Sequence, residues 1–543
     1  MNDESSRQFL ISDMDIPQPE SVSIDQAYDV PENELVAALL AEARLDPASQ
    51  DRVNLRAQAL VTAVRVRKQD QGLLEAFMQE YDLSSEEGVV LMCLAEALLR
   101  IPDVSTAEKL IADKLGDADW ESHLGKSSSV LVNASTWGLM LTGKLVALSE
   151  TTQSSFRTAL KRLVNRSGEP MVRTAIRQAM RIMGHQYVMG RTIEEAMDRA
   201  LQKKNRAYRF SFDMLGEAAL TTADSDRYQE SYRAAIEAIG AREKPDDIFA
   251  APSISVKLSA LHPRFESGQR DRVMKELTPR LLELAQLAFS NRIALTVDTE
   301  EADRLSLTLD VFSEVLKDSS LAGWDGLGLA LQTYQKRAPA MIDMLEQLSR
   351  ETAQRIPVRL VKGAYWDAEI KHAQVEGYAG YPVFTRKANT DVSYIACARR
   401  VLASRSAFYP QFATHNAQTI AVITELAGDR LDYEFQRLHG MGEDLYGVVM
   451  KEEGYHHACR VYAPVGSHED LLPYLVRRLL ENGSNTSFVN RIVDDSLPVE
   501  QVAEDPIQKV ASTEPAAHPA IPLPRNLYGS ERLNSRGVNL DNQ

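Results

Sequence analysis

The sequence predicts an α/β protein built on a TIM-type (βα)8 barrel, preceded by an α-helical arm of wrapping character. From Tyr208 onward, short apolar runs of strand character alternate with amphipathic helical segments. About eight such units in about 270 residues match a (βα)8 barrel in number and size. A doubly wound sheet would also collect ligands at strand ends, but at a switch point rather than around a ring, and is the less favoured choice.

The candidate strands are short, rich in β-branched and aromatic residues, and separated by helical segments such as Asp271–Phe289. They are Arg209–Phe212, Ser253–Leu258, Ile293–Val297, Leu327–Leu331, Val358–Val361, Gln411–Thr414, Tyr433–Gln436 and Cys459–Tyr462. A polar residue stands at or just beyond the C-terminal end of each: Asp213, Lys257, Asp298, Gln332, Lys362, His415, Gln436 and Tyr462. In a parallel barrel all of these open onto the face where active sites are built.

The remaining chain divides by composition. Helical periodicity runs from about Glu32 to Lys203, for example at 34–40, 87–99, 154–164 and 169–183. The longest uncharged stretch, Ser127–Gly143, is too short and too polar to span a bilayer. We expect a flexible acidic segment over 1–31, a helical arm and helical domain over 32–205, the barrel over 206–491, and a Pro-rich linker or tail over 492–543.

Composition excludes several classes of protein. The formal net charge of −16 opposes a general nucleic-acid binder, because phosphate contacts need clustered Lys and Arg. Cys93, Cys397 and Cys459 show neither paired nor metal-like spacing, which fits a reducing cytosol. The N-terminus has no basic region followed by an apolar one, so secretion is not expected. Without a Walker A or strand-linked G-x-G-x-x-G sequence, a dinucleotide would be held by side-chain cations and barrel loops.

The most informative segment is Val358–Trp366. It begins as a buried strand and breaks at Gly363, where it presents Arg359 and Lys362, backbone that a ligand can approach closely, and the rings of Tyr365 and Trp366. This combination suits a large, flat, anionic cofactor. An ordinary strand whose two cations form surface ion pairs is the alternative.

The last helical segment, within 466–483, brings Tyr474 within one turn of Arg478, next to Arg477. Two adjacent guanidinium groups beside an apolar stripe can grip one carboxylate by bidentate hydrogen bonds. A structural ion pair, for example with Glu217, is the alternative.

Three further strand-end residues leave their chemistry open. Lys257 or Lys362 could form a Schiff base inside a barrel, although charge complementarity to an anion is the commoner role. His415 could act as a base, a metal ligand or a hydrogen-bond donor to a cofactor ring. It lacks neighbouring ligands at metal spacing, so no metal site is expected.

Four motifs carry a resemblance to a known family. Phe210–Ala219, Ser255–Leu261, Arg359–Trp366 and Tyr474–Gly483 closely resemble the proline dehydrogenase part of the bacterial bifunctional flavoproteins called proline utilization A, over roughly Glu32–Arg491. The resemblance implies a distorted (βα)8 barrel that binds FAD and oxidises L-proline to Δ1-pyrroline-5-carboxylate by hydride transfer to the flavin N5. It also implies a cytoplasmic enzyme that passes electrons to a membrane quinone and associates peripherally with the membrane.

The resemblance also implies roles for individual residues. Those expected to bind the cofactor are Gln332, Arg359, Val361, Lys362, Gly363, Ala364, Tyr365, Trp366, Thr385, Lys387, Thr390, Thr414, His415, Asn416, Glu481 and Phe488. Those expected to form the proline pocket are Lys257, Asp298, Tyr365, Tyr462, Tyr474, Arg477 and Arg478. Glu217 is expected to pair with Arg477 as a gate at the mouth of the pocket.

Two departures from the family pattern shape the expected partners. Some members begin with a basic ribbon-helix-helix domain, whereas the N-terminus here is acidic, so no DNA binding is expected. Full-length members continue into an aldehyde dehydrogenase half, and Leu523–Gly529 resembles the approach to that half, which is expected to be absent from these residues. A Schiff-base lyase or aldolase on the same barrel and a non-catalytic scaffold are the alternative functions.

Overall fold

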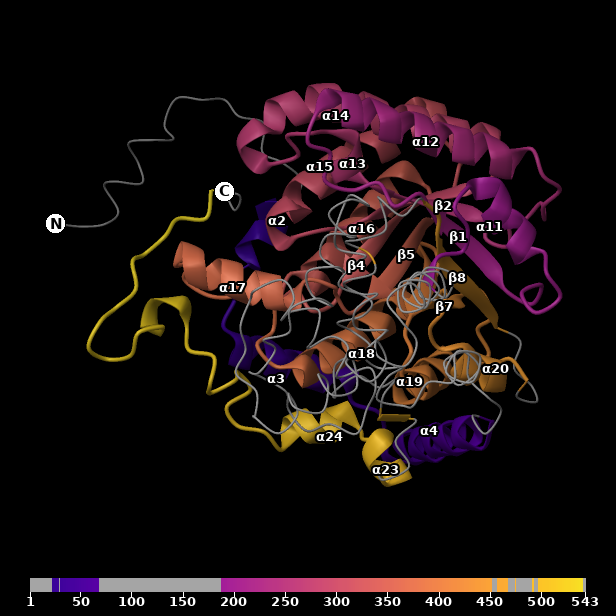
Figure 1. Cartoon of the computed structure of the whole chain (residues 1–543). Helices are drawn as coiled ribbons and strands as arrows, with labels where there is room; N and C mark the ends of the chain where they lie inside the picture. Colours follow the sequence, from indigo (N-terminus) through magenta and orange to yellow (C-terminus); the bar gives the residue numbers. More distant parts are fainter. Residues whose placement is uncertain are drawn as a thin grey trace, which may run out of the picture.

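The computed structural model describes residues 22–28, 30–67, 187–451, 457–466, 474, 491–492 and 497–540. At its centre is a closed barrel in which eight parallel strands pair in chain order and the last pairs with the first. Figure 1 shows helices around this barrel, with α3, α4, α23 and α24 at the bottom of the view. The predicted (βα)8 barrel with a helical region before it is confirmed.

Each predicted strand coincides with an observed one. The strands are β1 (Arg209–Asp213), β2 (Ser253–Lys257), β3 (Ala294–Asp298), β4 (Leu327–Gln332), β5 (Ile356–Val361), β6 (Phe408–Ala413), β7 (Glu434–Leu438) and β8 (Ala458–Pro464). The largest difference is at β6, which begins at Phe408 rather than at Gln411. Closure is exact in register, since Arg209 of β1 lies opposite Arg460 of β8 and Asp213 lies opposite Pro464.

Helices cover the outside of the strands. They are α11 (Ile193–Ala200), α12 (Thr222–Gly240), α13 (Leu258–Leu261), α14 (Arg270–Ser290), α15 (Leu305–Leu316), α16 (Ala338–Thr352), α17 (Trp366–Glu376), α18 (Lys387–Ala403), α19 (Ala417–Ala427) and α20 (Glu443–Val449), with short 3-10 turns η1 (Ser267–Gln269), η2 (Ala302–Arg304) and η3 (Ser319–Leu321). Strand residues alternate between the helix side and the barrel interior. Ile254 and Val256 of β2, both fully buried, pack outward, which leaves the alternate positions for the interior.

The N-terminal helices α2 (Val22–Gln26), α3 (Glu32–Ala43) and α4 (Pro47–Arg67) lie against the barrel helices. α3 packs on α18, and α4 packs on α19 and α20. The Glu32 carboxylate fixes α3 by accepting from Thr385 N–H at 2.9 Å, Thr385 Oγ1 at 2.8 Å and Asn389 Nδ2 at 2.7 Å. The helix predicted over 34–40 lies within α3, whereas those predicted over 87–99, 154–164 and 169–183 lie outside the described residues.

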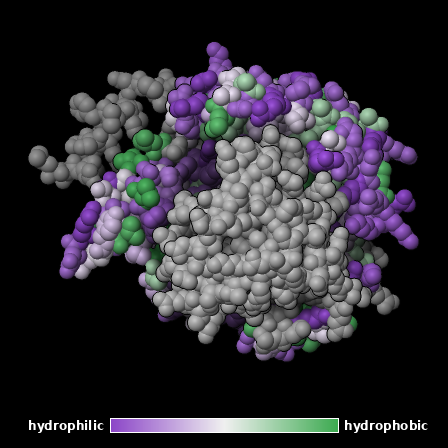
Figure 2. All heavy atoms as spheres, viewed as in Figure 1, coloured by the Kyte–Doolittle hydropathy of each residue, from purple (hydrophilic) through white to green (hydrophobic). Residues whose placement is uncertain are grey.

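The C-terminal segment from residue 497 runs along the barrel. It contains α23 (Val499–Val502), α24 (Pro506–Ala511) and the turn η4 (Pro524–Asn526), which pack on α4, on α3 and α18, and on α17 respectively. The composition of the predicted linker did not indicate these short helices. Figure 2 shows hydrophobic residues beside the C-terminal segment, whose exposed apolar residues are Leu523, Tyr528, Leu533, Val538 and Leu540. The boundaries of the four predicted regions stay predictions.

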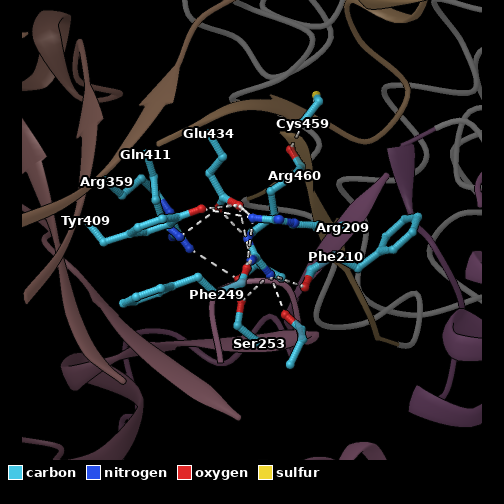
Figure 3. Close-up of polar contacts among 12 residues, drawn as sticks. Arg209, Phe210, Phe249, Ser253, Arg359, Tyr409, Gln411, Glu434, Cys459 and Arg460 are labelled. Atoms are coloured by element: carbon cyan, nitrogen blue, oxygen red, sulfur yellow. Dashed lines mark hydrogen bonds and ion pairs between the residues drawn. The ribbon is translucent and has the colours of Figure 1, made fainter. Parts of the chain in front are cut away.

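The N-terminal end of the barrel interior is filled by a buried polar group, here called the lower cluster: Arg209, Tyr409, Gln411, Glu434 and Arg460 (Figure 3). The fully buried Glu434 carboxylate accepts from Arg460 Nε at 2.5 Å, Gln411 Nε2 at 2.8 Å and Arg209 Nη1 at 3.1 Å. Arg460 also donates to backbone carbonyls of Phe210 and Ala251, each at 3.0 Å. Together with the bond from Arg460 Nη1 to Ser253 Oγ at 3.2 Å, these bonds join β1, β2, β6, β7 and β8 and close this end of the barrel.

Candidate functional site

The interior at the opposite, C-terminal end of the strands holds a second polar group, here called the upper cluster: Asp213, Lys257, Asp298, Arg359 and Tyr462. Each member occupies an inward position at or near the end of its strand, on β1, β2, β3, β5 and β8. TIM barrel interiors are usually filled by bulky aliphatic residues, and active sites of this fold lie at the C-terminal end of the strands, so five polar side chains at this end point to function. All five are at most 9% exposed.

Lys257 lies at the centre of the upper cluster. Its Nζ is 2.8 Å from Asp213 Oδ2, 3.4 Å from the Tyr462 hydroxyl and 3.7 Å from Asp298 Oδ2. The Tyr462 hydroxyl lies 2.6 Å from Asp213 Oδ2 and 2.7 Å from Asp298 Oδ2, and its single proton can serve one of them at a time. The structure therefore brings the predicted pocket residues Lys257, Asp298 and Tyr462 into one network.

Arg359 completes the network from β5. Its Nη1 pairs with Asp298, and its Nη2 donates to Ser255 Oγ at 2.9 Å and Ser211 Oγ at 3.2 Å. Its guanidinium carbon lies 5.2 Å from the centre of the Tyr462 ring, which fixes the orientation of that ring. Arg359 is 2% exposed, so the alternative of a surface ion pair is wrong for this residue.

Protonation in the upper cluster follows from burial and charge. Burial alone would lower the pKa of Lys257, but the Asp213 carboxylate, with Tyr462 and Asp298, raises it well above its usual range. Burial, reinforced by the charges of Asp213 and Asp298, raises the pKa of the Tyr462 hydroxyl well above its usual range. Lys257 is thus a fixed cation and Tyr462 a neutral donor. A protonated amine is a poor nucleophile, which disfavours the Schiff-base alternative at Lys257.

Tyr474 is the member of the last predicted helix that the structure describes. It is buried and packs in one apolar group with Tyr462, Leu215 and Met441. The predicted pocket residue Tyr474 therefore lies beside the upper cluster. Arg477, Arg478, Glu481 and Phe488 lie outside the described residues, and their roles stay predictions.

The loop after β5 makes a close turn. Gly363 has φ +138°, and a Cβ there would lie 2.4 Å from the Tyr334 ring, so only glycine fits. Lys362 pairs with Asp391 of α18, as the ion-pair alternative predicted. Trp366 Nε1 donates to the Phe384 carbonyl at 2.7 Å, which holds its ring in place. Within this loop Val361 and Tyr365 are half-buried and Ala364 is exposed.

A cavity of about 310 Å³ opens beside this loop, at the N-terminus of α18. It is lined by Trp366, Thr385, Arg386, Lys387, Ala388, Asn389, Lys509, Val510, Thr513 and His518. The Lys387 ammonium lies 5.6 Å from the centre of the Trp366 ring. α18 begins without a side-chain cap, so its first N–H groups add to the positive charge that favours anions at a helix N-terminus. Thr390 is buried one turn into the helix.

The predicted cofactor residues that follow β4 and β6 make hydrogen bonds to other parts of the protein. Gln332 at the end of β4 donates to the Thr299 carbonyl at 3.1 Å. His415 Nε2 accepts from the Leu438 N–H at 3.1 Å, so the proton of the neutral ring sits on Nδ1. Asn416 caps α19 by accepting from Gln418 N–H at 2.8 Å, and its own N–H donates to Thr414 Oγ1 at 3.1 Å. Cofactor contacts of these residues stay predictions.

The predicted pocket left out Asp213, Ser211 and Ser255, which the structure places in the network around Lys257 and Arg359. A signal was present, since polar residues stand at every second position of β1 and β2 and therefore share the interior face. Across the described residues, no three His, Cys, Asp or Glu side chains group as metal ligands would. No helix in the described part of the chain is long and apolar enough to cross a bilayer.

Comparison with family models agrees with this geometry. A model described as "Proline dehydrogenase" matches residues 196–491. "Proline utilization A proline dehydrogenase N-terminal domain" matches 22–65, which covers α2, α3 and most of α4. "DNA-binding domain of Proline dehydrogenase" matches 73–187, nearly all of which lies outside the described residues. This last match runs against the expectation, drawn from acidic composition, that no DNA-binding region is present.

Individual relatives give the same picture. The chain is 49% identical to the bifunctional protein PutA of Salmonella typhimurium over 558 residues, which cover 100% of this chain and 42% of that protein. It is 30% identical to proline dehydrogenase 2 of Bacillus subtilis over 239 residues, 43% of this chain and 67% of the relative. The chain thus spans less than half the length of the bifunctional relative.

Solved structures share the fold. A variant of Bradyrhizobium japonicum proline utilization A matches with a TM-score of 0.74 at 50% identity, over 95% of this chain and 51% of that one. A second structure, titled as a bifunctional proline utilization A protein, matches with a TM-score of 0.75 at 48% identity, with the same coverage.

Proposed function

Because the chain belongs to the proline dehydrogenase family, a family of flavoproteins, we propose that it oxidises L-proline to Δ1-pyrroline-5-carboxylate. The observation that carries the proposal is the upper cluster. Lys257, Asp298 and Tyr462 were predicted for the proline pocket, and they meet at the C-terminal end of the barrel within 3.7 Å of one another. Family membership and site geometry therefore favour the same reaction.

The charges of the upper cluster suit a zwitterionic amino acid. Within it, the cations of Lys257 and Arg359 balance the anions of Asp213 and Asp298, so a substrate carboxylate needs further positive charge. In the proposal Arg477 and Arg478 supply it by gripping the carboxylate, while Tyr365 and Tyr474 shape the space around the ring. The fixed side chains orient the carbon next to nitrogen and exclude water from it. The substrate amine has to be neutral for that carbon to lose hydride.

The cofactor in the proposal is FAD, and the residues present fit it. The rim of the cavity carries Arg386 and Lys387 at a helix N-terminus, and the flat ring of Trp366 lines the same cavity. These groups suit a pyrophosphate and an aromatic base. Arg359 Nε is buried and has no hydrogen-bond partner among the described residues. When bound, the flavin would supply the acceptor for the hydride.

Anaerobic titration with L-proline tests the proposal. We expect a yellow protein whose flavin absorbance bleaches on addition of L-proline and recovers when a quinone is added. A preparation that neither carries flavin nor takes up FAD would contradict the proposal. So would trapping of substrate on Lys257 or Lys362 by borohydride, which would support a lyase or aldolase instead.

The proposed partners are those that the family resemblance implies. We propose a cytoplasmic enzyme that passes electrons to a membrane quinone and associates with the membrane peripherally. Co-sedimentation with anionic lipid vesicles, before and after reduction by L-proline, tests that association. Equal sedimentation with and without vesicles in both redox states would contradict it.

The composition of the chain and the family-model match disagree about DNA binding. The net charge is −16, whereas a family model with a DNA-binding description matches 73–187. We retain the prediction that this chain binds no nucleic acid. In a gel shift with duplex DNA at about 50 mM salt, a retarded band that weakens as salt is raised would contradict it.

A further inference from the structure

One buried serine anchors the loop that follows β1, residues 214–220. Ser259 Oγ accepts a hydrogen bond from Ala218 N–H at 2.8 Å, and the Ser259 carbonyl accepts from Ala219 N–H at 2.9 Å. Ser259 lies on α13, two residues after Lys257, and is 2% exposed. The loop contains Glu217, the predicted gate residue. A link therefore runs from the strand end that carries Lys257 to the loop that carries Glu217.

The loop needs this anchor because its backbone is strained. Leu215 has φ +57° and Ala218 has φ +48°, a region that costs residues with a side chain on the order of 1 kcal/mol or more. Gly216 packs so closely that a Cβ there would lie 2.8 Å from the Tyr228 ring. Such a conformation persists only when its surroundings hold it.

Glu300 in turn holds Ser259. Its Oε1 accepts from Ser259 N–H at 3.0 Å, and its Oε2 accepts from Ser259 Oγ, so the hydroxyl can receive the Ala218 N–H only on a lone pair. Glu300 is 5% exposed and follows Asp298 of β3 by two residues. Arg304 Nη1 lies 3.6 Å from Glu300 Oε2 and partly balances its charge. Ser259 and Glu300 thus connect the loop after β1 to the ends of β2 and β3.

We propose that Ser259 and Glu300 are positioning residues that hold the loop 214–220, and with it Glu217, in place at the rim of the site. This inference rests on the proposed function and on the predicted role of Glu217 as a gate at the mouth of the pocket. Neither residue touches the upper cluster through a recorded hydrogen bond. Their effect is on the capture of substrate, because the groups that orient the reacting carbon belong to other side chains.

The test measures KM and kcat for L-proline together with flavin content in three variants. S259A removes the hydroxyl that receives the Ala218 N–H, and we expect KM to rise about tenfold with kcat within about twofold of wild type. E300Q keeps the shape but has one acceptor oxygen for the two Ser259 donors, and we expect KM to rise about threefold to fivefold. E301Q is the matched control, since Glu301 is adjacent and half-exposed, shares Arg304 with Glu300 and has no recorded hydrogen bond to Ser259. E301Q should leave KM and kcat unchanged.

A second readout uses tetrahydrofuran-2-carboxylate, which has an ether oxygen in place of the amine and cannot become an imine. Its Kd, read from the perturbed flavin spectrum, should weaken in S259A and E300Q as KM does. The inference is overturned if both variants match E301Q, or if kcat falls while KM and Kd stay constant. If S259A fails to fold, the isosteric E300Q decides by the same criteria. Failure of the proposed function looks different, because wild type itself would then not be reduced by L-proline.

Discussion

The two ends of the barrel interior both bury charged side chains, but they satisfy them differently. In the lower cluster, Arg460 donates to the carbonyls of Phe210 and Ala251 as well as to Glu434. In the upper cluster, every recorded hydrogen bond of the Lys257 and Arg359 side chains goes to another side chain. Backbone partners cannot move without unfolding, whereas side chains can exchange partners when a ligand arrives. This difference supports the proposal that the lower cluster serves stability and the upper cluster serves substrate chemistry.

Breaking the lower cluster should have the largest effect on stability. R460M leaves the Glu434 carboxylate buried with fewer partners, which we expect to reduce the free energy of unfolding by roughly 3–5 kcal/mol. Chemical denaturation measures this loss. Activity per bound flavin should stay within about twofold of wild type at low temperature, and a selective loss of activity without destabilisation would contradict the assignment.

Removing the central cation of the upper cluster should have the largest effect on activity. K257M leaves Asp213 and Asp298 without their shared ammonium and distorts the pocket, so we expect kcat/KM for L-proline to fall by about 100-fold to 1000-fold. K204M changes an exposed lysine and is the control, and it should leave kcat/KM for L-proline unchanged. Activity within tenfold of wild type would remove Lys257 from the site.

The carboxylates around the upper end should make stability depend on pH. Burial, with the charge of Glu301, raises the pKa of Glu300 to about 7 from 4.5. The folded state therefore favours the protonated form, and its contribution is complete below the unfolded pKa and lost as pH rises through 7. From pH 5 to pH 8 this group should lower the free energy of unfolding by roughly 2–3 kcal/mol.

Denaturation curves at pH 5 and pH 8 measure that difference. E300Q should remove this loss, because glutamine does not titrate, whereas E301Q should retain most of it, because burial is the larger cause of the raised pKa. An E300Q protein with the full pH dependence of wild type would show that Glu300 is not its source. Glu369 of α17, whose pKa burial also raises to about 7, adds a second contribution that E369Q would remove.

The smallest expected effect comes from a single hydroxyl. Y462F keeps the ring over Arg359 but removes the donor to Asp213 and Asp298, and we expect kcat/KM to fall about tenfold. The free energy of unfolding should change by about 1 kcal/mol or less, since Lys257 still balances both carboxylates. A larger loss of stability than in R460M would reverse the comparison between the two ends.

The barrel could be predicted from the sequence because local composition marks each of its strands. Pro357–Val361 reads as a buried strand by composition alone, and the polar residue at each strand end predicted the face on which Lys257, Asp298 and Tyr462 meet. The lower cluster went unrecognised because Glu434 and Arg460 lie within segments read only as strands. Their pairing depends on registers that join β7 to β8 and β8 to β1.

The contacts of the N-terminal helices could not be predicted from local sequence patterns, for the same reason. Glu32 meets Thr385 and Asn389 across more than 350 positions of chain, and nothing near Glu32 indicates those partners. The Ser259–Glu300 link is likewise long-range, although each residue follows the observed end of its strand, Lys257 or Asp298, by two positions. Short periodicities predict which face a residue occupies, whereas strand register and helix packing decide what it touches.

The division of roles between the two clusters is tested by the rate at which L-proline reduces the bound flavin in a single anaerobic turnover, compared between Y462F and R460M. We predict that R460M, although less stable, reduces its flavin at the wild-type rate, while Y462F is slowed about tenfold. The opposite pattern, a slow R460M beside an unimpaired Y462F, would contradict the assignment of chemistry to the upper cluster and stability to the lower one.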